Sequence, residues 1–74
     1  MANEETGGVV KITELVGSSP NSFSDAVRNA VKEASKTIRG IQGVEVMSSN
    51  ASVNDSGELT NYKVNVKIAF LVER

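Results

Sequence analysis

The clearest pattern in the chain is an alternation of apolar and polar residues over the last segment, 58–74. One face would carry Tyr62, Val64, Val66, Ile68, Phe70 and Val72, and the other Lys63, Asn65, Lys67, Ala69, Leu71 and Glu73. Alternation with period two is typical of a β-strand with one buried face. The pattern therefore predicts a long strand at the end of the chain.

Two other segments show the same period less clearly. In residues 9–17 the apolar positions are Val10, Ile12 and Val16, with Lys11 and Thr13 on the opposite face. This predicts a half-buried strand in which Glu14 interrupts the apolar face, either as a solvated or salt-bridged carboxylate or as one in an apolar setting. Residues 44–53 predict a weaker strand, whose polar middle indicates a bulge or a cavity-facing stretch, followed by a turn at 54–59.

Residues 22–40 have the period of a helix instead. Apolar residues recur at steps of three and four, at Phe23, Ala26, Val27, Ala30, Val31, Ala34 and Ile38. This predicts an amphipathic helix with one apolar stripe. Ser22 and Asp25 have the spacing of a capping box at its start, and we expect Gly40 to end it in the left-handed conformation.

The element order is thus β-α-β-β, an α+β domain. The last two strands form a hairpin, and the helix returns the chain so that the first two strands run in the same direction. A purely antiparallel sheet then requires the third strand to be central, in the order 1-3-2. One helix covers only one face of such a sheet. The uncovered face, with Ala69 and Leu71 beside Lys63, Asn65 and Lys67, predicts packing against another subunit.

Composition narrows the function. With 74 residues the chain is one domain, small enough to need support from self-association, and we expect residues 1–8 to be a disordered tail before a single domain at 9–74. It has no Cys and no His, which removes the nucleophile systems that rely on them, so we predict that it is not an enzyme. A net charge of −1 gives no reason to expect nucleic acid, and the absence of a long apolar run predicts no membrane partner and a cytoplasmic protein.

Two polar segments and one pair of lysines each allow two interpretations. The segment "GSSPNS" before the helix is either an anion cradle or a turn with an N-cap, and "SSNASVNDSGE" is either a calcium site or a polar hairpin. Lys63 and Lys67, on one face of the last strand, either bind a phosphate or carboxylate or are solvated or intersubunit salt-bridge lysines. We predict no metal-ligating residues.

Three stretches of the chain resemble the dodecin family. "ELVGSSPNSFSDAVRNAV" is similar to the first strand, turn and alanine-rich helix of the family, and "TIRGIQGVEV" and "YKVNVKIAF" to its helix exit and last strand. The likeness spans residues 9–72. It implies a hollow homododecamer that binds or stores a flavin, riboflavin or FMN, at subunit interfaces.

The resemblance also implies a ligand site. At Gly43 the family has a Trp that stacks on the flavin ring, and at Lys63 a Gln that bonds the polar edge of the ring. The site residues expected in this chain are Gly43, Val44, Glu45, Lys63 and Asn65. With both family residues replaced, we expect flavin to bind weakly or in an altered pose. The alternative is a shell that binds a metal ion such as calcium or another anionic small molecule, or that is purely structural.

Overall fold

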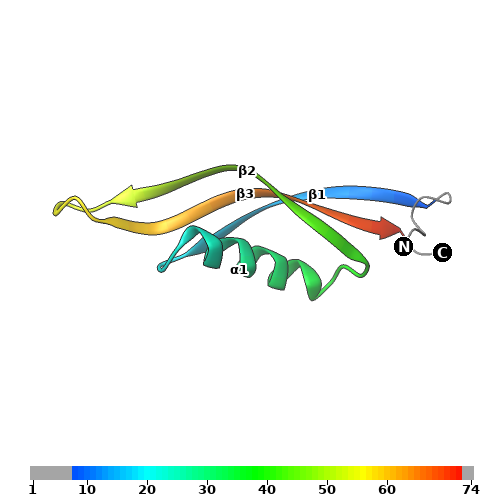
Figure 1. The fold of residues 1–74 in the computed structure, drawn as a ribbon. Helices are drawn as coiled ribbons and strands as arrows, with labels where there is room; N and C mark the ends of the chain where they lie inside the picture. The colour runs from blue at the N-terminus through cyan, green and yellow to red at the C-terminus, as the bar shows by residue number, and fades with distance from the viewer. Residues whose placement is uncertain (1–7, 73–74) are drawn as a thin grey trace.

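The structure is a computed structural model that describes residues 8–72. It contains the strand β1 (Val9–Ser19), the helix α1 (Phe23–Ser35) and the strands β2 (Ile41–Val53) and β3 (Leu59–Val72). The strands form one antiparallel sheet in the order β1-β3-β2, with α1 along one side (Figure 1). The predicted fold class and strand order are confirmed, whereas residues 1–7 of the expected tail lie outside the described residues. No described helix is long and apolar enough to cross a membrane.

The strand register divides the sheet into two faces. Val64, Val66 and Ile68 of β3 are completely covered by α1 and its neighbours. We call the other side the helix-free face. It is formed by β3 residues Lys63, Asn65, Lys67, Ala69 and Leu71, by their β1 partners Ser18, Val16, Glu14, Ile12 and Val10, and by their β2 partners Asn50, Ser48, Glu45 and Gly43. The predicted faces of the last strand are therefore confirmed.

The core is small because helix and sheet approach closely. It consists of three alanines on α1, Ala26, Ala30 and Ala34, against the three buried residues of β3. Gly17 on β1 permits this approach: a Cβ there would lie 2.2 Å from the carbonyl oxygen of Ala26 and 2.9 Å from the Cβ of Ala30. No side chain fits at that position unless the helix moves away.

The orientation of β1 in the structure differs from the prediction. The alternation in residues 9–17 predicts a half-buried strand, which places Val10, Ile12 and Val16 on its buried face. In the structure they lie on the helix-free face and are 46%, 54% and 65% exposed. The face toward the helix instead has Leu15 and Gly17, because α1 packs too closely for larger residues at Gly17.

The start of α1 follows its sequence signal in part. Ser22 is the N-cap, and its Oγ accepts a hydrogen bond of 3.0 Å from the backbone N–H of Asp25. Asp25 does not complete the capping box, because its Oδ2 accepts a 2.7 Å hydrogen bond from the buried Ser19 hydroxyl. Phe23 packs edge-on against Tyr62 of β3, with ring centroids 4.9 Å apart. The start of α1 is thus held to the end of β1 by the Ser19–Asp25 hydrogen bond and to β3 by the Phe23–Tyr62 contact.

The end of α1 lies earlier than predicted. The helix ends at Ser35, and the N–H groups of Thr37 and Ile38 both bond the carbonyl of Ala34 to close the last turn. Gly40 does have the expected left-handed conformation, with φ of 75°, but it turns the chain into β2. Its carbonyl accepts a 2.9 Å hydrogen bond from the N–H of Leu71, so this turn is attached to β3.

The predicted irregularity of β2 is confirmed as a series of bulges. The register against β3 shifts between Ile41 and Gly43 and between Val46 and Ser48, so that Gln42 and Met47 are extra residues. Each extra residue reverses which positions face the helix. A third register shift lies near the hairpin end, where β3 has Asn61 with a φ of 46°.

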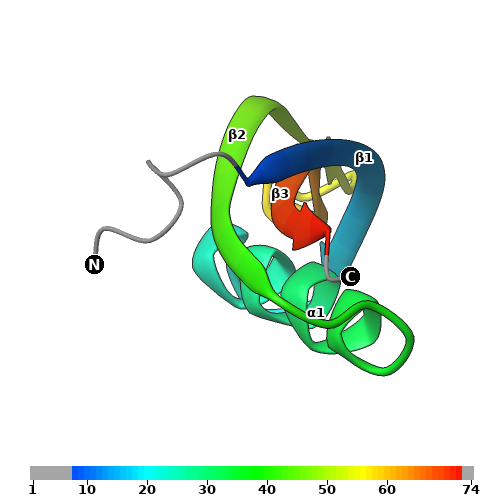
Figure 2. The same ribbon diagram turned by 90° about the vertical axis from the view of Figure 1, so that its right-hand side faces the viewer.

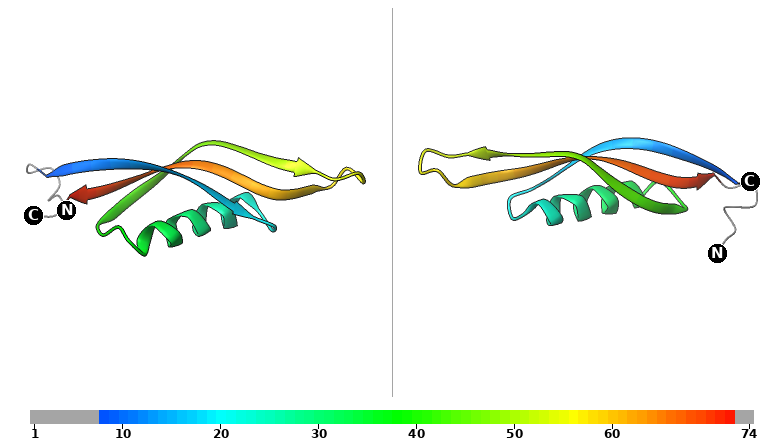
Figure 3. Two further views of the ribbon diagram at one scale, coloured as in Figure 1. Left: turned by 180° about the vertical axis from the view of Figure 1, so that it is seen from behind. Right: turned by 45° about the horizontal axis from the view of Figure 1, so that its top comes forward.

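The helix covers only part of the sheet. Seen along its length, the sheet arches over α1, which lies on one side (Figure 2). The hairpin of β2 and β3 extends past the start of the helix (Figure 3). Val53 and Leu59, a pair near the hairpin tip, are 63% and 52% exposed. A single chain therefore leaves apolar surface uncovered on the helix-free face and along the hairpin.

We predict that Gly17→Ala lowers the free energy of unfolding by about 1–3 kcal/mol, as for other overpacked sites, because the new Cβ meets backbone that must move. Urea unfolding at a fixed protein concentration measures it. Gly43→Ala is the control, since nothing lies within 4 Å of a Cβ there. Equal midpoints for the two variants would contradict the close packing.

Candidate ligand-binding face

Four of the five predicted site residues lie on the helix-free face. Gly43, Glu45, Lys63 and Asn65 belong to it by register. Val44 lies on the other side of the sheet, opposite the buried Ile68. A ligand on the helix-free face would therefore meet the other four but not the side chain of Val44.

The surroundings of Gly43 are open. It lies opposite Ala69, whose partner on β1 is Ile12, so this row of the face is apolar. A Cβ at Gly43 would have no heavy atom within 4 Å, and its φ is not in the left-handed region. The glycine is thus not required by the packing or backbone of one chain, and a Cβ there would meet open space.

Gly43 and Lys63 lie at opposite ends of the face. Gly43 is opposite Ala69, and Ala69 is six positions along β3 from Lys63. At about 3.3 Å per residue this is a distance of about 20 Å. One chain therefore does not bring the two positions to one small ligand, and a site that uses both needs more than one copy.

The middle of the face is charged. Lys67 lies directly opposite Glu14 on β1 and Glu45 on β2, so a cation stands between two carboxylates. Lys67 forms no salt bridge with either carboxylate. Among residues 8–72 the salt bridge formed is the exposed one between Lys36 and Glu33, at 3.1 Å. Cross-strand neighbours of opposite charge still stabilise a sheet, which favours the solvated or salt-bridged interpretation of Glu14 and Lys67.

The end of the face around Lys63 is polar but neutral. Lys63 lies opposite Ser18 on β1 and Asn50 on β2. In the next row, the Asn65 amide donates a 3.0 Å hydrogen bond to the Ser48 hydroxyl. Ser18, Ser48 and Asn50 belong to the two polar segments noted in the sequence, but the sequence does not link them to Lys63, because the strand register is what brings them together.

The other polar segments are occupied by their own hydrogen bonds. In "GSSPNS", the Ser22 hydroxyl caps α1, which supports the N-cap interpretation over the anion cradle. In the hairpin, Asn54 Oδ1 accepts from the N–H groups of Ser56 and Glu58, at 2.9 and 3.0 Å, and Gly57 turns the chain with φ of 81°. Within residues 8–72, no three His, Cys, Asp or Glu residues are grouped to hold a metal ion. The hairpin interpretation is therefore favoured for "SSNASVNDSGE".

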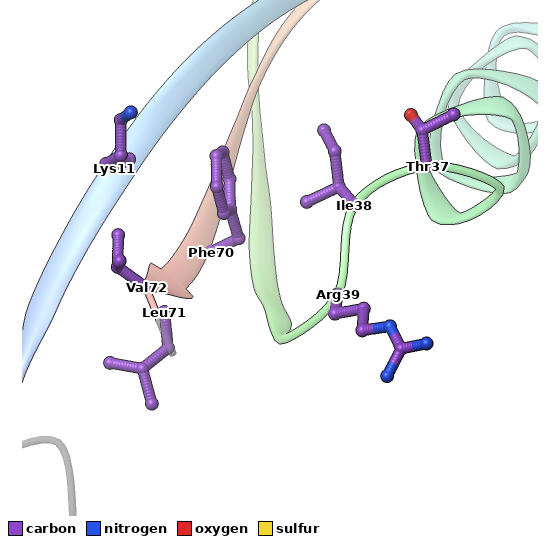
Figure 4. A pocket seen from close by; sticks show the side chains of 7 residues that line it. All are labelled: Lys11, Thr37, Ile38, Arg39, Phe70, Leu71 and Val72. Atoms are coloured by element: carbon purple, nitrogen blue, oxygen red, sulfur yellow. The ribbon is translucent and has the colours of Figure 1, made fainter. Parts of the chain in front are cut away.

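A shallow apolar cavity lies elsewhere, on the helix side of the sheet. It is lined by Lys11, Thr37, Ile38, Arg39, Phe70, Leu71 and Val72. Figure 4 shows Phe70 of β3 facing Ile38 of the connection after α1, with Lys11 and Arg39 at the margins. None of the predicted site residues lines it, and Leu71 is the one residue that it shares with the helix-free face as defined above.

Comparison with known proteins gives a consistent result. The family model described as Dodecin matches residues 9–73. A dodecin from Thermus thermophilus is 31% identical over 67 residues, 90% of this chain and 96% of that protein. The solved dodecin of Streptomyces coelicolor is 35% identical, covers all of this chain and 99% of its own, and superposes with a TM-score of 0.84.

A third relative is described by the ion it binds. The calcium dodecin of Mycobacterium tuberculosis is 27% identical over 62 residues, 84% of this chain and 86% of that protein. Its crystal structure is described as having a novel calcium-binding site and superposes with a TM-score of 0.74 at 25% identity. At least one protein of this fold is therefore described as binding calcium.

We predict that Lys67→Glu destabilises the protein by about 1 kcal/mol more than Lys63→Glu, because it places three like charges in one cross-strand row. Lys63→Glu is the matched control, with the same charge change between neutral neighbours. Urea unfolding at low salt measures the difference. Molar salt should reduce it through screening, and equal effects at low salt would refute the charged row.

Proposed function

The chain belongs to the dodecin family, and from this premise we propose that it assembles into a homododecameric hollow shell that binds a small ligand. The observation that carries the proposal is the helix-free face. It combines exposed Val10, Ile12 and Val16 with the two positions implied as ligand contacts, and it is too extended for one chain to complete a site.

Self-association also agrees with the energetics of a chain this size. Six small or β-branched residues form the buried apolar core, and three exposed aliphatic residues on one face of β1 find no cover within the chain. Small domains without disulfides usually gain stability from oligomerisation. We propose residues 9–74 as the single domain that assembles, in the cytoplasm and without enzymatic activity.

For the ligand we propose a flavin, riboflavin or FMN, bound weakly or in an altered pose. Dodecins bind flavins, and Gly43 and Lys63 stand where the family's Trp and Gln are implied. Glycine has no aromatic surface, and an aromatic pair is worth about 0.5–1.5 kcal/mol beyond its area. Lysine donates hydrogen bonds but cannot accept one, unlike glutamine.

A divalent cation is the second candidate ligand. It is favoured by the calcium dodecin relative, and by the Glu14 and Glu45 carboxylates on the face that copies would share. Oxygen ligands from several chains can meet at a symmetry axis even where one chain holds no cluster. Calcium retained by the purified assembly would support this candidate, and a shell that binds neither calcium nor flavin would be structural.

We predict that native mass spectrometry shows a species of twelve times the 7.8 kDa chain mass, and that Ile12→Asp shifts it to smaller species. Ile12 is 54% exposed in the chain, so a charge there is tolerated by the fold but costly in a packed interface. Ser24→Asp, on exposed α1 surface, adds the same charge and should leave the assembly unchanged. A monomeric wild type would refute the shell, and the same spectra report any bound calcium.

We predict that Gly43→Trp tightens riboflavin binding about tenfold or more, because it adds an aromatic platform where space is open. Riboflavin fluorescence titration measures the dissociation constant for wild type and variant. Gly43→Leu is the control, since it adds apolar bulk without an aromatic ring. Equal tightening by Leu would exclude stacking, and riboflavin fluorescence that a large excess of every variant leaves unchanged would refute the flavin proposal.

A further inference from the structure

The two lysines on the central strand of the helix-free face have different electrostatic surroundings. Lys67 lies between Glu14 and Glu45, which more than compensate its charge. Lys63 lies between Ser18 and Asn50, which are neutral, and its Nζ makes no salt bridge or hydrogen bond with residues 8–72. Lys63 is therefore the uncompensated cation of this face.

No carboxylate of the sheet comes near Lys63. The charged row of Lys67 is four residues away along β3, about 13 Å, which exceeds the screening length of about 8 Å at physiological ionic strength. In the hairpin direction Glu58 is five residues away, about 16 Å. Asp25 lies on the other side of the sheet, where it accepts the hydrogen bond of Ser19.

The groups around Lys63 are hydrogen-bond donors. Ser18, Ser48 and Asn50 present hydroxyl and amide groups on the same face. The Ser48 hydroxyl accepts its 3.0 Å bond from Asn65, so its own proton remains available to donate. A lysine ammonium with neighbouring hydroxyl and amide donors is the chemistry that recognises a phosphate group.

We propose that this end of the helix-free face, formed by Ser18, Ser48, Asn50 and Lys63, binds a phosphate monoester. In the shell this would be the phosphate of FMN, so that the chain selects the phosphorylated flavin over riboflavin. The choice of flavin rests on the proposed function, whereas the affinity for phosphate rests only on the residues of this face. The lysine, in place of the implied glutamine, changes which part of the ligand is recognised.

Equilibrium ultrafiltration with riboflavin and FMN tests the selection, because free flavin is read by absorbance and stacking is not needed for a signal. Wild type should bind FMN about tenfold more tightly than riboflavin, the scale of one charge-assisted hydrogen bond. Lys63→Gln should abolish the preference and Lys63→Arg should retain it. Lys67→Gln, with the same charge change on the same face, should also retain it.

Two results overturn the selection: equal binding of FMN and riboflavin by wild type, or a preference that survives Lys63→Gln. If neither flavin binds, the flavin proposal fails, and calorimetric titration with inorganic phosphate tests the site alone. Uptake of phosphate by wild type and Lys67→Gln, but not by Lys63→Gln, would support it. Absence of phosphate uptake by wild type would overturn it. The unfolding midpoint of each variant, measured in parallel, shows that the compared proteins are folded.

Discussion

The close contact between α1 and β1 at Gly17 is the constraint on which the rest of the fold depends. A Cβ at Gly17 would lie 2.2 Å from the Ala26 carbonyl, so the helix can lie this close only over a residue without a side chain. The buried positions of the helix are all alanine, at Ala26, Ala30 and Ala34, which agrees with this closeness. The core is therefore thin, and a thin core limits how much apolar area one chain can bury.

The consequences of this thin core appear on the other side of the sheet. Large apolar residues of β1 cannot all face the helix, and Val10, Ile12 and Val16 point away from it. Val10 and Ile12 lie opposite Leu71 and Ala69 of β3, whereas Val16 lies opposite Asn65. The helix-free face thus has an apolar end, a charged middle and an end that is polar apart from Val16. A face with this division suits contact with other copies at one end and with a polar ligand at the other.

Much of the fold was predictable from the sequence, since it depends on local pattern. The alternation of 58–74 and the helical stripe of 22–40 each reflect one element packed on one partner, and the order 1-3-2 follows from chain direction in an antiparallel sheet. The predictions that were wrong involve two elements at once. The face of β1 depends on how close the helix lies, and Gly40, expected to end α1, instead forms a turn whose carbonyl accepts a hydrogen bond from Leu71 of β3.

The ligand face was predictable only in part, for a related reason. Gly43 and Lys63 were identified by resemblance, but Ser18, Ser48 and Asn50 reach Lys63 through the register of three strands. The bulge at Met47 decides that Ser48 and Asn50, rather than Met47 and Ser49, share a face with Lys63. Lys63 and Lys67 are both lysines on the same face of the same strand, and only their cross-strand neighbours distinguish them. The chemistry of this face is thus a property of strand pairing, which no single segment of the sequence contains.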